Sequence, residues 1–349
     1  MSQEEINNFL SNFNHSLDGK TATNIINKLN YKTKKDLYFA IKRANNFVDI
    51  QKINKQNIQQ LLKEKGNVDL LTYSFPCQDL STANTSKNNV KGMKKNSNSR
   101  SGLVWEIERI LNIFQEENKL PGFLLLENVP AMLNKHHKQD YESWLKTLKE
   151  LNYSTLTLVL NSFDYGSIQK RKRVYGISIL NYNGKTNEKG EILDLKIPKS
   201  IKKEKQKIQD VLKLDYTNSV YLKEAIEAQP KRTKSREKIY IKNPKLNLKT
   251  KSIRTLTTRQ DRNPNCGIVS LKNTILDNQK RKLNNKANFR FITPREAYLC
   301  MGFNEEDFNK VSIKNITKAK LYQQAGNSIV IYALKVVIKL IQKQFNKKK

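Results

Sequence analysis

A series of short apolar runs, separated by stretches with helical spacing, constrains the fold of this chain most strongly. The runs lie at 68–74, 123–126, 154–160 and 174–180. Each is short and rich in β-prone residues, so each predicts a buried strand. Residues 58–65, before the first run, and residues 103–114 and 140–151, between later runs, have the spacing of helices. This alternation predicts an α/β fold with a mostly parallel sheet.

Two residues with reactive side chains follow predicted strands. Cys77 stands in the turn Pro76-Cys77-Gln78 directly after the first strand, and Glu127 ends the second. Ligands of open α/β sheets bind outside the carboxyl ends of the strands, so both side chains are expected in one pocket. An isolated cysteine is more often a small buried hydrophobe, and an isolated glutamate more often half of a structural ion pair. The Pro-Cys-Gln turn favours a nucleophile instead.

The chain is strongly basic. It has 65 Lys and Arg against 32 Asp and Glu, a formal charge of +33. An AT-rich coding genome is one explanation for so much Lys, Asn and Ile. Residues 191–290 nevertheless hold 26 Lys and Arg against 10 Asp and Glu. A basic surface concentrated in this way predicts a polyanionic partner such as a nucleic acid.

Cysteine and histidine usage argues against metal sites and disulfides. The three cysteines have no Cys-x-x-Cys spacing, and the three histidines form no His-x-x-x-His pair. We therefore expect reduced thiols, no metal and a cytoplasmic location. No run of about 18 apolar residues predicts a membrane span.

The two ends of the chain show helix signals. Ser2-Gln-Glu-Glu5 forms a capping-box pattern before a helical preface over 2–30. Thr293-Pro-Arg-Glu296 predicts a helix start, and Ser328–Phe345 an apolar final helix. Between these ends, beyond residue 182, Gly and Pro interrupt lysine-rich stretches, which indicates a second domain.

Several motifs occur in a specific order. They are Pro76-Cys77-Gln78, Glu127-Asn128-Val129, Gln169-x-Arg171-x-Arg173, Thr293-Pro-Arg-Glu296 with Met301-Gly302-Phe303, and Gly326-Asn327-Ser328. With this order the chain resembles the cytosine-5 DNA methyltransferases over roughly residues 45–340. The resemblance implies a Rossmann-like class I methyltransferase sheet with helices on both faces. It also implies a catalytic domain over 1–182, a smaller basic target-recognition domain over 183–303, and a segment 304–349 that returns to the catalytic domain.

The same resemblance implies an activity and its residues. S-adenosylmethionine would be the methyl donor, and the substrate a cytosine rotated out of double-stranded DNA. Cys77 would attack the ring, Glu127 would protonate it, and Arg171 and Arg173 would pair Glu127 and the cytosine carbonyl. The expected cofactor-binding residues are Asp49, Ile50, Pro76, Leu103, Asn327 and Ser328.

DNA contacts are expected from two places. The loop from Leu80 to Arg100 resembles the family's closing loop and offers Ser81 and Arg100, and Gln78 precedes it. In the recognition region, the segment 255–262 has polar and forked side chains suited to base edges. Its candidates are Thr257, Thr258, Arg259, Gln260 and Arg262. A structural turn before Asn263-Pro264 explains this segment equally well.

One element of the family pattern is missing. The family opens with a strand and a Phe-x-Gly-x-Gly-type turn for the cofactor, but no two of the twelve glycines here are closer than Gly184 and Gly190. The fold is therefore expected to be incomplete at its N-terminus. A second polypeptide could supply this part, the start could be truncated, or the gene could have decayed; we favour the first two.

Three functions remain open at this stage. The leading one is DNA cytosine methylation, in a restriction-modification system. A tRNA cytosine-5 methyltransferase is less favoured, because the basic region is large and that branch's Cys-Phe-Thr signature is not found. The third is an inactive DNA-binding remnant, suggested by the missing glycine turn.

Overall fold

The structure is a computed structural model, and it describes residues 2–12, 25–77, 80, 92–95, 99–198, 200, 205–277, 285–313 and 316–348. The chain forms two compact units. The first comprises Met1–Leu158 and Val174–Leu195, and the second Val159–Arg173 and Lys196–Lys349. Our division into domains at residues 182 and 303 stays a prediction beside these units.

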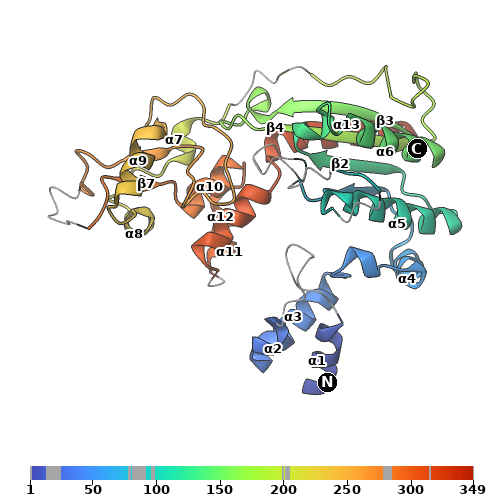
Figure 1. Cartoon of the computed structure of the whole chain (residues 1–349), viewed down its shortest axis with the longest axis horizontal. Coiled ribbons are helices and arrows are strands. Elements are labelled where there is room, and N and C mark those ends of the chain that lie inside the picture. The colour runs from blue at the N-terminus through green and yellow to red at the C-terminus, as the bar shows by residue number, and fades with distance from the viewer. Residues whose placement is uncertain are drawn as a thin grey trace. The chain divides into compact units, whose positions relative to one another are not determined.

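The first unit contains helices that precede and alternate with strands (Figure 1). Its helices are α1 (Gln3–Ser11), α2 (Ile25–Lys28), α3 (Tyr31–Arg43), α4 (Lys55–Lys65), α5 (Val104–Glu116) and α6 (Lys138–Glu150), with short 3-10 turns η1 (Ile50–Lys52), η2 (Ser101–Leu103) and η3 (Pro130–Leu133). Its strands are β1 (Leu70–Tyr73), β2 (Phe123–Asn128), β3 (Tyr153–Asn161) and β4 (Lys172–Leu180), of which β3 ends and β4 begins in the second unit. The four predicted strands are confirmed, each end lying within two residues of its expected place.

The N-terminal helices α1 to α3 form a small group of their own, coloured blue in Figure 1. Ser2 and Glu5 make the predicted capping box at the start of α1. Ile6 and Leu10 of α1 are fully buried and pack with Ile41 of α3. The expectation of a helical preface is confirmed, although α3 was not foreseen.

The sheet of the first unit has the strand order β1-β2-β4-β3. β1 and β2 are parallel, with Tyr73 opposite Leu126, whereas β2 and β4 are antiparallel. Our expectation of a mostly parallel sheet is therefore wrong for this pair. The neighbouring strands β3 and β4 are joined only by residues 162–171. This connection is too short for the crossover that two parallel neighbours require.

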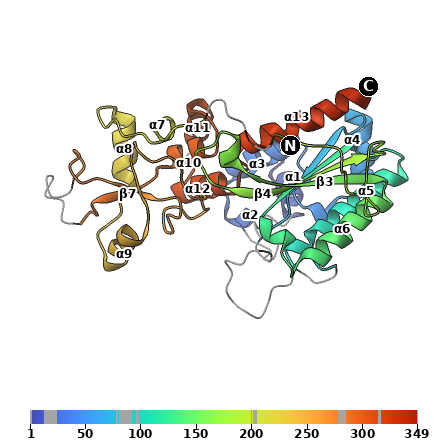
Figure 2. The same cartoon turned by 90° about the horizontal axis from the view of Figure 1, so that it is seen from above.

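Helices α5 and α6 lie along this sheet (Figure 2). Val104 and Leu111 of α5 and Trp144 of α6 are fully buried in one cluster with Leu124 of β2. Each helix is apolar on one side and polar on the other, as the sequence spacing predicts. The cluster fixes the strands whose ends carry Cys77 and Glu127.

The second unit contains a small sheet, several short helices and one long final helix. Its helices are α7 (Ile208–Val211), α8 (Ser219–Ala228), α9 (Lys234–Lys242), α10 (Pro294–Cys300), α11 (Glu305–Ser312), α12 (Lys318–Asn327) and α13 (Ile331–Lys348), with the 3-10 turn η4 (Ser162–Tyr165). Its sheet has the order β5-β6-β7, formed by β5 (Lys245–Leu246), β6 (Ile268–Ser270) and β7 (Phe289–Phe291). The predicted helix start is confirmed, since Thr293 caps α10 and Pro294 is its first residue.

A buried ion pair stabilises the centre of the second unit. Arg290 of β7 and Glu296 of α10 are both fully buried, and the guanidinium donates to both carboxylate oxygens at 2.7 and 2.8 Å. Arg290 also donates to the hydroxyl of Tyr216 at 3.0 Å. Two buried charges need such complete pairing, because either one alone would be costly.

The stretch Lys318–Lys347, which holds α12 and α13, is long and apolar enough to cross a membrane by length and composition. Core helices of soluble proteins meet the same criterion. Val330, Ala333 and Val337 are buried within the protein, and 44% of the most apolar window is buried. Packing against protein therefore accounts for much of its apolar surface.

Candidate active site

Cys77 lies in a turn that is held from two sides. The Asn128 side-chain amide donates to the carbonyl of Phe75 at 3.1 Å, and the Ser101 hydroxyl donates to that of Pro76 at 2.6 Å. The Leu80 amide closes the turn on the Cys77 carbonyl at 3.1 Å. The thiol itself is half-buried. A partly accessible thiol is suited to nucleophilic attack.

Glu127 lies at the carboxyl end of β2, at the sheet edge that also follows β1. The two strands are parallel and in register at Tyr73 and Leu126, so the residues after them emerge side by side. The Ser74 hydroxyl donates to Glu127 Oε2 at 3.2 Å. The structure therefore brings Glu127 beside the segment that leads to Cys77. Ser74 was missed from sequence, although a polar residue at the end of an apolar strand is a usable signal.

The other two cysteines differ from Cys77. Cys266 and Cys300 are fully buried, and burial raises the pKa of both thiols. They are therefore held as neutral thiols, which are poor nucleophiles.

Arg171 joins separate segments of the second unit by hydrogen bonds. Its side chain is 5% exposed, and its terminal nitrogens donate to the carbonyls of Leu256 at 3.0 Å, Gly326 at 2.9 Å and Ser328 at 3.3 Å. These bonds join three segments that are distant in sequence. The expected pairing of Arg171 with Glu127 stays a prediction. Arg173 is partly exposed and donates to the carbonyl of Lys172 at 2.8 Å.

Gln169 and Gly326 also contribute to the packing of these segments. Gln169 is fully buried, accepts the Leu256 amide at 2.9 Å and donates to the Cys300 carbonyl at 3.3 Å. A Cβ on Gly326 would lie 2.6 Å from the main-chain nitrogen of Thr258. Only glycine allows α12 to approach that backbone so closely. The motifs Gln-x-Arg and Gly-Asn-Ser thus meet at residues 256–258.

Four of the predicted cofactor-binding residues lie in the first unit. Asp49 accepts the Gln51 amide at 3.0 Å and begins η1, while Ile50 and Leu103 are partly exposed and pack on the same apolar cluster. Pro76 is also partly exposed. Arg109 was missed from sequence; it donates to the carbonyls of Ile50 and Ile53 and fixes this segment. Apolar surface next to a carboxylate fits an adenine ring with its amino group.

The remaining two, Asn327 and Ser328, lie in the second unit after α12. Asn327 is exposed, and the Ser328 hydroxyl donates to the Ala325 carbonyl at 2.8 Å. Among the described residues, no group of three or more His, Cys, Asp or Glu is arranged to hold a metal ion.

The predicted DNA contacts have mixed outcomes. Gln78 and Ser81 lie outside the described residues. Arg100, Thr257 and Thr258 are partly exposed, and Arg259 and Arg262 are exposed. Our expectation for Gln260 is corrected: its side chain is fully buried and donates to the Gly267 carbonyl at 3.5 Å, so it has no access to a base edge.

A thiol and a carboxylate follow adjacent parallel strands of this α/β sheet, an arrangement that suits group transfer through a covalent nucleophile. The sequence profile of the family described as C-5 cytosine-specific DNA methylase matches residues 4–343. The chain belongs to this family of methyltransferases, which confirms the resemblance, the enzyme class and the expected action on DNA cytosine. The family also implies a methyl donor.

Similar proteins agree with this assignment. The chain is 34% identical over 360 residues to the orphan methyltransferase M.SssI of Spiroplasma monobiae, covering 97% of this chain and 82% of that protein. It is 32% identical over 344 residues to the type II methyltransferase M2.ScrFI of Lactococcus lactis subsp. cremoris, with the same coverage of 97% and 82%.

Solved structures confirm the Rossmann-like α/β fold. The Entamoeba histolytica methyltransferase EhMeth superposes with a TM-score of 0.59 at 18% identity, covering 85% of this chain and 82% of its own. The S. pombe Dnmt2 methyltransferase gives a TM-score of 0.57 at 19% identity, covering 85% and 83%. At these identities the likeness is one of fold alone.

Proposed function

We propose that this chain transfers a methyl group from S-adenosylmethionine to carbon 5 of a flipped cytosine in a specific duplex DNA sequence, as part of a restriction-modification system. The observation that carries the proposal is the placement of Cys77 and Glu127 after adjacent parallel strands, with Asn128 and Ser74 linking the two strand ends. The restriction-modification context is supported by the likeness to M2.ScrFI, a type II methyltransferase.

The residues of the first unit supply the covalent chemistry. The Cys77 thiolate adds to carbon 6 of the cytosine ring, and Glu127 gives a proton to the ring nitrogen as electrons move toward it. Carbon 5 thereby becomes an enamine carbon, which is a nucleophile. S-adenosylmethionine, when bound, supplies the methyl cation. Solvent water then takes the proton from carbon 5, the electrons of that bond expel the Cys77 thiolate, and Glu127 recovers its proton from the ring nitrogen.

Asn327 and Ser328 are proposed as cofactor contacts on the family resemblance alone. In the first unit, the proposed contacts are Asp49, Ile50, Pro76 and Leu103. Their fit rests on the partly exposed apolar surface of Ile50 and Leu103 next to the Asp49 carboxylate.

A second polypeptide is proposed to supply the glycine turn for the cofactor. Among the described residues, β1 pairs only with β2 and forms an edge of the sheet. The unpaired backbone groups of an edge strand invite pairing with a further strand. This proposal fails if the purified chain alone binds S-adenosylmethionine tightly and methylates DNA.

The cellular setting is proposed to be the cytoplasm. All three cysteines are free, which fits a reducing compartment. The substrate, duplex DNA, is there in a bacterial cell, and the positive charge of the chain favours its approach.

Trapping with fluorinated cytosine tests the chemistry. Fluorine at carbon 5 cannot leave as a cation, so the covalent adduct with Cys77 should persist after methyl transfer. The assembled enzyme should give a stable protein–DNA adduct at Cys77 by mass spectrometry, and Cys77→Ala should give none while still binding DNA. Cys266→Ala is the matched control and should form the adduct. An adduct elsewhere, or none with wild type, would refute the proposal.

An inactive DNA-binding remnant is the second candidate, favoured by the absence of closely spaced glycines. Reconstitution with a polypeptide that carries the glycine turn separates the two. Methyl transfer in the mixture supports the divided enzyme, whereas DNA binding without transfer supports the remnant.

A further inference from the structure

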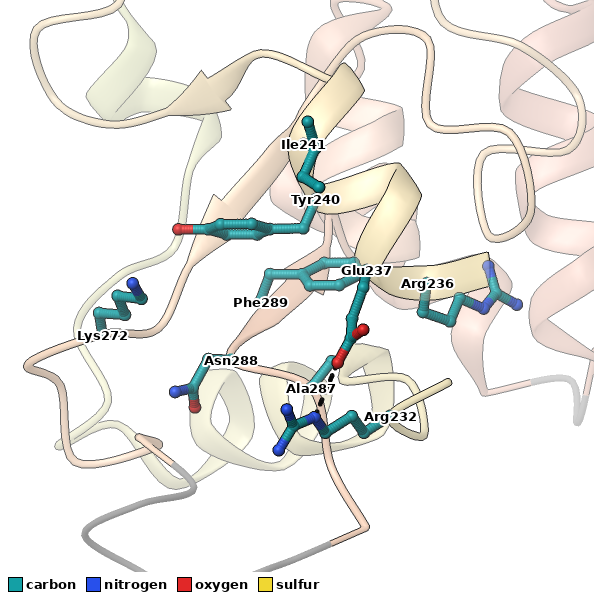
Figure 3. A pocket seen from close by; sticks show the side chains of 9 residues that line it. All are labelled: Arg232, Arg236, Glu237, Tyr240, Ile241, Lys272, Ala287, Asn288 and Phe289. Atoms are coloured by element: carbon teal, nitrogen blue, oxygen red, sulfur yellow. Dashed lines mark hydrogen bonds and ion pairs between the residues drawn. The ribbon is translucent and has the colours of Figure 1, made fainter. Parts of the chain in front are cut away.

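A cavity of about 360 Å³ lies between α9 and β7 in the second unit (Figure 3). Tyr240 of α9 and Phe289 of β7 form an aromatic wall, with ring centroids 5.8 Å apart and planes inclined by 36°. Phe289 is 2% exposed and fixed, whereas Tyr240 is partly exposed. The buried Phe289 ring therefore forms the apolar floor of the cavity, and the Tyr240 ring forms a side that solvent can reach.

Cationic side chains stand at the edges of this cavity. Lys272 is exposed, and its ammonium lies 6.0 Å from the centre of the Tyr240 ring. Figure 3 shows the Tyr240 hydroxyl directed to the side where Lys272 stands. Arg232 stands near Ala287 and pairs with Glu237 at 2.9 Å, and both side chains are more than half exposed. Arg236 is directed away from the cavity, with its guanidinium 5.1 Å from the centre of the Phe291 ring.

The helix beside the cavity is unusually basic and poorly buried. Residues 231–245 contain seven Lys or Arg and a single acidic residue, Glu237. No residue of α9 is buried. A helix with this charge and so little core contact contributes little to folding, and its repelling cations are costly without counter-ions. An anionic partner would relieve that repulsion.

We propose that this cavity binds a sugar–phosphate unit of the DNA backbone. Lys272 and Arg232 hold phosphate oxygens, and the deoxyribose packs on the Tyr240–Phe289 wall. The site positions the duplex without reading its sequence, because phosphate contacts carry no base information. This inference rests on the proposed function, of which it names the substrate-binding surface.

Salt dependence of DNA binding tests the charge contacts. The full chain is titrated with a fluorescent 30-bp duplex at several salt concentrations. Lys272→Ala should reduce the slope of log K against log salt by about 0.9. When salt is raised fourfold, the variant should therefore lose about 3.5-fold less affinity than wild type. Lys272→Arg should keep the slope. Lys310→Ala, on α11 of the same unit and with a side chain 69% exposed, is the charge-matched control and should leave the slope unchanged.

Packing on the aromatic wall is tested separately. Tyr240→Leu should weaken binding with an unchanged salt slope, because it removes contact area and no charge. For all these variants the ranking of DNA sequences should stay as in wild type. A slope for Lys272→Ala equal to that of Lys310→Ala overturns the proposal, and so does a changed sequence preference, which would indicate base readout.

Methyl transfer in the same variants separates this inference from the proposed function. With the assembled enzyme, kcat at saturating DNA should be unchanged in Lys272→Ala while KM for DNA rises. If wild type binds DNA but transfers no methyl group, the proposed reaction fails while the binding test above still applies. If wild type transfers methyl groups and Lys272→Ala matches Lys310→Ala in KM, only the cavity assignment fails.

Discussion

The Ser74 hydroxyl donates a hydrogen bond to Glu127 Oε2 at 3.2 Å and links the ends of β1 and β2. Because the bond orients the Glu127 side chain, Ser74→Ala should lower kcat by about 2- to 10-fold, as expected for one hydrogen bond of roughly 0.5–1.5 kcal/mol. Steady-state methyl transfer measures this. Ser74→Thr keeps the hydroxyl and should retain most activity; equal rates for Ser74→Ala and wild type would contradict the role.

Replacing the carboxylate itself should cost more. Glu127→Gln keeps the shape of the side chain but removes its acidic proton, so methyl transfer should fall by about 10²- to 10⁴-fold, the usual contribution of general acid catalysis. Exchange of tritium from carbon 5 of cytosine reports formation of the Cys77 adduct and should fall in parallel. Undiminished exchange would show that another group protonates the ring.

Arg171 is expected to matter for stability. Arg171→Met removes buried charged hydrogen bonds to Leu256, Gly326 and Ser328 and should lower the free energy of unfolding by roughly 3 kcal/mol. Urea denaturation of the full chain measures this. Arg173→Met, at a partly exposed side chain, is the control and should cost less than about 1 kcal/mol. Lost activity with unchanged stability in Arg171→Met would instead assign Arg171 to the chemistry.

Replacing Gly326 by alanine should change the stability of the protein in a direction that the packing determines. Alanine inside a helix is normally stabilising by about 1 kcal/mol relative to glycine. Here its Cβ would lie 2.6 Å from the Thr258 nitrogen, so Gly326→Ala should destabilise by about 1–3 kcal/mol. Lys320→Ala, at a partly exposed position of the same helix, is the control. A higher melting temperature for Gly326→Ala would show that the two segments separate readily.

His137 should make stability depend on pH. It is 4% exposed, and burial lowers its pKa below the ordinary 6.5, while the nearby Asp140 opposes the shift. The unfolded chain therefore takes up the proton more readily. The stability conferred by the neutral imidazole is complete above about pH 6.5 and is lost as the pH falls toward the folded-state pKa.

Melting temperatures of wild type should accordingly fall between pH 7.5 and 5 more steeply than those of His137→Leu. The exposed neighbour offers a matched control, and His136→Leu should follow the wild-type profile. If the melting temperatures of wild type and His137→Leu change with pH in the same way, His137 does not contribute to the pH dependence of stability.

The sequence predicted the first unit well because its signals are local. Strand ends fix where Cys77 and Glu127 emerge, and the helices between them have clear apolar spacing. Even the incorrect parallel pairing of β4 had a local cue, the ten residues between β3 and β4. Parallel strands need a longer connection than this.

The structure of the second unit was harder to predict from the sequence, because its interactions are not local. Strands of two or three residues, such as β5 and β6, are too short to show a period. The bonds of Arg171 reach residues 85 and 155 positions away, so no spacing rule reveals them. Gln260 illustrates the same limit: its polarity suggested DNA contact, but tertiary packing directed its amide inward to Gly267.

The division of the chain has a practical consequence for engineering. The second unit contains Val159–Arg173 as well as Lys196–Lys349, so its sequence is discontinuous. A chimera that receives only residues 196–349 would not contain Gln169 and Arg171 of this chain. It would therefore lack the hydrogen bonds that they make to Leu256 and Gly326. Chimeras designed to exchange sequence specificity should carry the short insert together with the long one.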